Sequence, residues 1–215
     1  MLETLSVALF CITLLYVTIT TRLAAYVSVL RAQGILLFIF VIAHYTELGL
    51  FHTLFLSFET LIIKTMLIPL FLTFIIKKIS VKRETEPFID NFHSLMITTL
   101  IIMLSFIIAV FIKRLDSSIN ALQLAVSIAS LSIGLFIIIS RKKIITHVMG
   151  YLIFENGIYL MAFTLAGHQP IIIETGVLLD IFIGVLIMGI FVNRISSTTE
   201  SLDQSELRRL TDSCS

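Results

Sequence analysis

Residues 144–166 read IITHVMGYLIFENGIYLMAFTLA, an apolar run in which one carboxylate, Glu155, stands among Leu, Ile, Phe and Tyr. About 20 apolar residues are enough for a helix to cross the hydrocarbon core of a bilayer. A carboxylate near the centre of such a helix costs about 3 kcal/mol on insertion scales, and usually faces a bundle interior or a water path. Glu155 is therefore the first candidate for a functional residue.

Composition extends this prediction to the whole chain. The 215 residues are 58% hydrophobic and 13% charged, and the mean hydropathy is +1.06. These values exceed those of soluble domains and predict an all-α integral membrane protein. Membrane strands are not favoured, because the apolar runs are continuous instead of alternating. The net charge of +1 indicates no nucleic-acid partner.

No motif for redox or hydrolytic chemistry occurs in the sequence. Cys11 and Cys214 are too far apart in sequence to suggest a metal site, and no phosphate-binding glycine loop or Ser/His/Asp set is present. We therefore expect no catalytic residue, no metal site and no cofactor in this chain.

The apolar runs define about seven transmembrane helices within residues 1–195, followed by a cytoplasmic tail, 196–215. The first run has no basic residue before it, so we expect it to remain as a helix and not to act as a cleaved signal peptide. The predicted helices are 4–20, 24–45, 52–76, 94–112, 119–140, 144–166 and 171–193.

Basic residues predict the orientation. Twelve of the fifteen Lys and Arg residues follow the odd-numbered helices or lie in the tail, whereas the opposite side carries only Lys113 and Arg114. By the positive-inside rule, the N-terminus is outside and the C-terminus is cytoplasmic, in a bacterial or archaeal plasma membrane.

Other charged residues also fall inside predicted helices. Asp180 and Lys64 are expected near the midplane, and Glu59 and Glu174 nearer the outer surface. An ammonium at the midplane needs a carboxylate or water beside it. Glu59 is predicted to be a poor partner for Lys64, since five positions correspond to about 140° around an α-helix. We expect the partner on another helix or another subunit.

The sixth helix also carries a row of residues at four-residue spacing: His147, Tyr151, Glu155 and Tyr159. Residues at i and i+4 are neighbours on one helix face, and imidazole, phenol and carboxyl groups can all exchange protons. One interpretation is a proton-conducting row. The other is an interfacial His with aromatic residues of the membrane boundary, which we favour for His147. Glu155 and Asp180 are expected to lie close together and to titrate as a coupled pair.

The two halves of the chain show weak similarity. Residues 30–36 (LRAQGIL) parallel 153–159 (IFENGIY), and the stretch from Glu59 to Lys64 parallels that from Glu174 to Asp180. This predicts a duplicated unit of three helices, with both copies in the same orientation, joined by the fourth helix.

The stretches GYLIFENGIYL (150–160) and PIIIETGVLLDIFIGV (170–185) resemble the hydrogenase-4 component E family. The last three helices are also similar to the K subunit of respiratory complex I and the C subunit of Mrp antiporters. In that subunit two consecutive helices each bear a buried Glu in the proton path. Glu155 matches the first, and Asp180 falls where the second is expected.

The resemblance implies a non-catalytic membrane subunit of a complex I-like hydrogenase or formate hydrogenlyase-type complex. Such a subunit would contribute to proton or cation translocation beside other membrane subunits. Nickel–iron hydrogenase and iron–sulfur partners would lie on the cytoplasmic side. Two alternatives remain at this point: a subunit of a cation/proton antiporter-like complex without hydrogenase, and an assembly scaffold in which the buried charges only pair.

Overall fold

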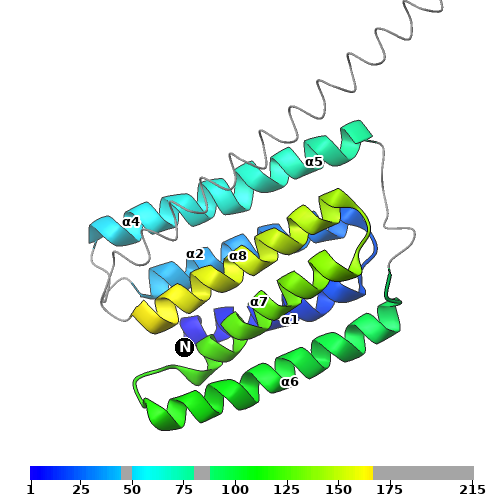
Figure 1. The fold of residues 1–215 in the computed structure, drawn as a ribbon. Helices are drawn as coiled ribbons and strands as arrows, with labels where there is room; N and C mark the ends of the chain where they lie inside the picture. Colours follow the sequence, from blue (N-terminus) through cyan, green and yellow to red (C-terminus); the bar gives the residue numbers. More distant parts are fainter. Residues whose placement is uncertain (45–49, 80–87, 167–215) are drawn as a thin grey trace, which may run out of the picture. The chain divides into compact units, whose positions relative to one another are not determined.

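A computed structural model of the chain describes residues 1–44, 50–79 and 88–166, and every regular element in these ranges is helical (Figure 1). The predicted all-helical class is confirmed. The elements are α1 (Leu2–Ile19), α2 (Leu23–Ala43), α4 (Leu50–Phe58), η1 (Glu59–Leu67), α5 (Ile68–Ile79), α6 (Asn91–Leu115), α7 (Ala121–Ser140) and α8 (Ile144–Ala166).

Six helices in the described ranges are long and apolar enough to cross a membrane. They match the first six predicted helices to within three residues at every end. The predicted seventh helix, 171–193, and the predicted tail, 196–215, lie outside the described residues.

The third of these helices is made of three consecutive elements, because α4 continues into the π-helix η1 and then into α5. A π-helix pairs each backbone N–H with the carbonyl five residues earlier and is rare. Side-chain hydroxyls assist this geometry: Thr65 Oγ1 donates to the carbonyl of Thr60 at 2.9 Å, and Thr60 Oγ1 donates to that of Leu56 at 2.9 Å. The π-helical stretch contains both Glu59 and Lys64.

The α7–α8 pair has the most extensive helix–helix contact, and glycines allow it. A Cβ on Gly134 would lie 2.6 Å from the backbone nitrogen of Phe154 and 2.8 Å from the carbonyl oxygen of Gly150. Such close backbone approach between small residues is typical of helices packed within a membrane. α6 packs against α7 and α1, and η1 and α5 pack against α2 (Figure 1).

Contacts between helix ends agree with strict alternation of the helices across a membrane. Glu3, at the start of α1, meets Asn120, just before α7, and lies 3.8 Å from Nε2 of His44 at the end of α2. Arg141, at the end of α7, donates from Nη2 to the carbonyl of Thr18 near the end of α1 at 2.9 Å. Ends that the sequence predicts on one side of the membrane are thus neighbours.

Candidate functional site

Lys64 lies between two carboxylates in the middle of its helix. Its Nζ is 3.6 Å from Oε1 of Glu155 on α8 and 4.0 Å from Oε1 of Glu59 on η1. All three side chains are at least 95% buried. The expectation that Lys64 has a carboxylate partner on another helix is confirmed by Glu155.

The expectation that Glu59 is a poor partner for Lys64 is wrong. It assumed α-helical geometry, in which residues five apart point in different directions. In η1 the hydrogen bonds run between residues five apart, so positions i and i+5 lie nearly one above the other. The local change of helix type therefore places Glu59 and Lys64 on one face.

Close packing of α2 against η1 fixes this face in place. A Cβ on Gly34 would lie 2.5 Å from Thr65 Oγ1, 3.1 Å from the Thr65 backbone nitrogen and 3.2 Å from the carbonyl carbon of Lys64. Only a residue without a side chain permits this approach. Gly34 thus sets the distance between α2 and the backbone that carries Lys64.

Two further residues of α8 contact the ammonium of Lys64. The Tyr159 ring centroid is 4.7 Å from Nζ, within the range of a cation–π interaction. Asn156 Oδ1 accepts a hydrogen bond from Nζ at 3.5 Å. Consecutive residues Glu155 and Asn156, with Tyr159 one turn later, therefore present a carboxylate, an amide and a ring to the same cation.

The polar contacts continue away from Lys64 across α2 to α1. Asn156 Nδ2 donates to Gln33 Oε1 at 3.0 Å, and Gln33 Nε2 donates to Thr13 Oγ1 at 3.0 Å. Sequence reasoning did not select Asn156, Gln33 or Thr13 as site residues. The signal that could have found two of them was the similarity of 30–36 to 153–159, in which Gln33 and Asn156 occupy the same position.

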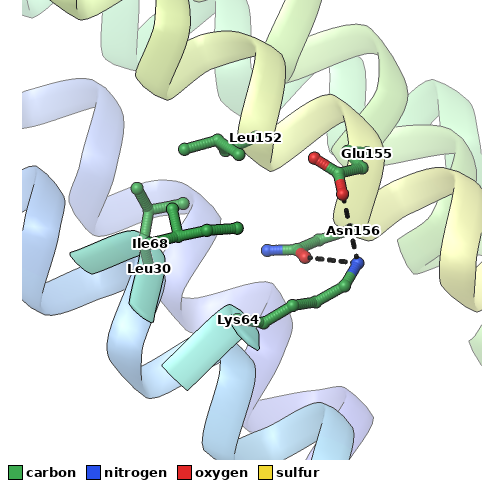
Figure 2. A pocket seen from close by; sticks show the side chains of 6 residues that line it. All are labelled: Leu30, Lys64, Ile68, Leu152, Glu155 and Asn156. Carbon is green, nitrogen blue, oxygen red and sulfur yellow. Dashed lines mark hydrogen bonds and ion pairs between the residues drawn. The ribbon is translucent and has the colours of Figure 1, made fainter. Parts of the chain in front are cut away.

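A small cavity of about 10 Å³ opens beside the charged groups (Figure 2). Apolar side chains of Leu30, Ile68 and Leu152 form one part of its lining, and Lys64, Glu155 and Asn156 form the other. A buried water needs about 10–15 Å³ and two to four polar partners. The cavity thus has the size and the polar groups for one water molecule at the ion pair.

The other predicted site residues do not join this cluster. Tyr151 is half-buried and its ring lies 6.3 Å from that of Phe154. His147 Nε2 is 2.6 Å from the carbonyl oxygen of Arg141, near the start of α8. Glu174 and Asp180 lie outside the described residues, so the predicted Glu155–Asp180 pair stays a prediction.

Among the described residues, no group of three or more His, Cys, Asp or Glu side chains is arranged to hold a metal ion. The chemistry available at the cluster is that of two carboxyls, an ammonium and neutral hydrogen-bonding groups. These groups can bind, release and relay protons.

The chain is similar to known proteins at modest identity. It is 28% identical over 131 residues to an uncharacterized protein of Mycobacterium tuberculosis, covering 61% of this chain and 60% of that protein. It is 26% identical over 154 residues to hydrogenase-4 component E of Escherichia coli K12, covering 72% of this chain and 71% of that protein. The same values hold for hydrogenase-4 component E of Shigella flexneri.

No family model and no solved structure matches the chain at a significant level. The matched stretch spans less than two thirds of the mycobacterial protein. Together with the six apolar helices, these similarities support a multi-pass membrane protein similar to a component of a hydrogenase.

Proposed function

We propose that the chain is a non-catalytic membrane subunit of a complex I-like hydrogenase assembly, and that Glu59, Lys64 and Glu155 form a proton-carrying site within it. The observation that carries the site proposal is the buried Lys64 ammonium, held 3.6 Å and 4.0 Å from two carboxylates on different helices. Similarity to hydrogenase-4 component E supports the assembly.

Charge balance explains why this cluster suits proton transfer. Two ionised carboxyls and one ammonium carry a net charge of −1, which is costly in a low-dielectric bundle. Binding one proton makes the cluster neutral. Lys64 can then pair with whichever carboxyl is ionised, while the other holds the proton.

The arrangement gives the proton two positions on two helices. Glu59 belongs to η1 and Glu155 to α8, and the flexible four-carbon stem of Lys64 can follow the ionised carboxyl. The cavity at Glu155 offers a place for one water that could deliver or remove the proton. Redox chemistry would take place in partner subunits and would drive this exchange through changes at the helix positions.

The assembly is tested by purifying the tagged chain from its own cells under mild detergent and identifying the proteins that remain bound. The proposal predicts nickel–iron hydrogenase and iron–sulfur subunits together with large membrane subunits. Recovery with antiporter-like membrane subunits alone would overturn the hydrogenase part.

The proton site is tested by infrared difference spectroscopy of the same complex between acid and alkaline pH. The proposal predicts a protonated carboxyl band that disappears in Glu155→Gln or Glu59→Gln. Glu3→Gln is the matched control, because Glu3 lies at the end of α1 and is partly exposed. A band that survives both of the first two substitutions would show that the cluster binds no exchangeable proton.

A further inference from the structure

The polar chain that leaves Lys64 has a fixed direction. Lys64 at one end has only donors, and the carbonyl of Phe10 at the other end is only an acceptor, with Thr13 Oγ1 donating to it at 2.6 Å. Thr13 must therefore accept from the Gln33 amide nitrogen, which turns the Gln33 oxygen toward Asn156. Asn156 in turn presents its nitrogen to Gln33 and its oxygen to Lys64.

Both amides consequently point their negative ends toward the ammonium. Hydrogen-bonded groups in a chain polarise one another, and the effect is larger in a low-dielectric interior. Gln33 is fully buried and Asn156 is 5% exposed, so little water competes for these bonds. Neither amide can rotate by half a turn without placing two donors or two acceptors against each other.

The two amides also occupy equivalent positions in the predicted repeat. Three contacts join residues 123 positions apart: Gln33 with Asn156, Thr18 with Arg141, and Phe40 with Phe163, whose ring centroids are 5.3 Å apart. Contact between a residue and its own equivalent is what a twofold relation produces near its axis.

Burial follows the same offset. Of the ten buried positions of α2, nine have a buried counterpart 123 residues later, in α8. Gly34 corresponds in this way to Gly157, whose Cβ would lie 2.8 Å from the backbone nitrogen of Leu131 on α7. The amide pair thus belongs to a regular interface between two similar helix pairs, and its position is set by the packing of both.

We propose that Asn156 and Gln33 are positioning residues that bridge the equivalent helices α2 and α8 and hold the Lys64 ammonium between Glu59 and Glu155. The proposal rests on the proposed function for its biological meaning, but the bridge itself is a property of the folded chain. Thr13 completes the bridge by supplying the acceptor that orients Gln33.

The test is nitrogen NMR of the lysine Nζ groups in the full chain, reconstituted in lipid nanodiscs. The Lys64 signal is the one that disappears in Lys64→Gln. Asn156→Leu is expected to shift this signal, and Thr13→Val to shift it in the same direction by less. Thr98→Val is the matched control, because the buried hydroxyl of Thr98 donates only to its own helix, at the carbonyl of Ser94.

A swap of the two amides gives the sharper test. Gln33→Asn shortens the bridge by one methylene and Asn156→Gln lengthens it, so each alone is expected to shift the Lys64 signal. The double variant Gln33→Asn/Asn156→Gln restores the combined length and is expected to bring the signal back toward that of the unmodified chain.

Two results would overturn the bridge: a Lys64 signal that responds to Thr13→Val no more than to Thr98→Val, or a double variant no closer to the unmodified chain than either single one. Circular dichroism of each variant checks that the helices are intact, and the near-isosteric Thr13→Val keeps the test decisive if Asn156→Leu does not fold. The NMR measurement involves no proton transport. Failure of the proposed function would therefore appear in the infrared experiment, and failure of the bridge would appear here.

Discussion

At the scale of single residues, Lys64 determines whether the buried carboxyls can coexist. Glu59 and Glu155 both lie within 4.0 Å of its Nζ, and both are almost fully buried. Replacing the ammonium by an apolar group leaves two carboxyls facing each other without a counter-charge. Loss of one partner from a buried ion pair typically costs about 3–5 kcal/mol.

We predict that Lys64→Met lowers the free energy of unfolding of the detergent-solubilised chain by about 3–5 kcal/mol at neutral pH. Adding Glu155→Gln to the same chain should recover part of this loss, because one of the two uncompensated charges is removed. Denaturant unfolding followed by circular dichroism measures both. Lys142→Met is the control, since Lys142 is exposed and lies 5.0 Å from the ring of Phe88 at the end of the bundle. Equal stability of Lys64→Met and Lys142→Met would contradict the ion-pair cluster.

At the scale of helices, the π-helix η1 is the element that assembles the site. It aligns Glu59 with Lys64, and Gly34 brings α2 close against it. Hydropathy predicts where a helix crosses a membrane, because the apolar run must match the thickness of the hydrocarbon core. Hydropathy carries no information on whether backbone N–H groups pair four or five residues back. The helix was therefore predictable and the Glu59–Lys64 contact was not.

We predict that Gly34→Ala destabilises the chain by about 1–3 kcal/mol, as overpacking of a close interface usually does. The added methyl would lie 2.5 Å from Thr65 Oγ1. Thr65→Ala in the same chain removes that atom and should recover part of the loss, although the Thr65 nitrogen remains 3.1 Å away. Ser28→Ala, an exposed position on the same helix, is the control. Unchanged stability of Gly34→Ala in denaturant unfolding would show that α2 and η1 are not this close.

A second prediction at this scale concerns the α7–α8 pair. Gly134→Ala places a methyl against backbone atoms of Phe154 and Gly150, which cannot rotate away as a side chain can. The two helices must separate, so we expect a loss of about 1–3 kcal/mol in the free energy of unfolding. Leu135→Ala removes a much larger group from the next position, which is 48% exposed on the outside of the described bundle. If Leu135→Ala proves more damaging than Gly134→Ala in detergent unfolding, the close contact is absent.

At the scale of the whole molecule, alternation of the helices agrees with the described contacts, while the side on which each end lies stays a prediction from basic residues. The sequence predicts a cytoplasmic C-terminus and an external loop at residues 167–170. A reporter fused after Ser215 should therefore be active only as a cytoplasmic fusion, and one inserted between Gly167 and Pro170 only as an external one. Two reporters on the same side would remove the seventh helix from the account.

The candidate site was partly predictable from sequence for a physical reason. Glu155 and Lys64 stand out because charge in an apolar run is expensive, and Tyr159 because it shares a helix face with Glu155. Asn156 and Gln33 carry no charge, so the same reasoning passed over them. Their roles depend on which helices are neighbours, and only the three-dimensional arrangement shows that α2 meets α8 at these two residues.

The central claim is that Glu155 exchanges the proton that the complex moves. The most direct test measures proton movement and redox turnover together in membrane vesicles containing the assembled complex with Glu155→Gln. The substitution keeps the shape and hydrogen bonding of the side chain and removes its titration. We predict an assembled complex in which proton movement is lost, whereas Glu3→Gln vesicles retain it. Full proton movement in an assembled Glu155→Gln complex would contradict the claim and leave the buried charges with a structural role.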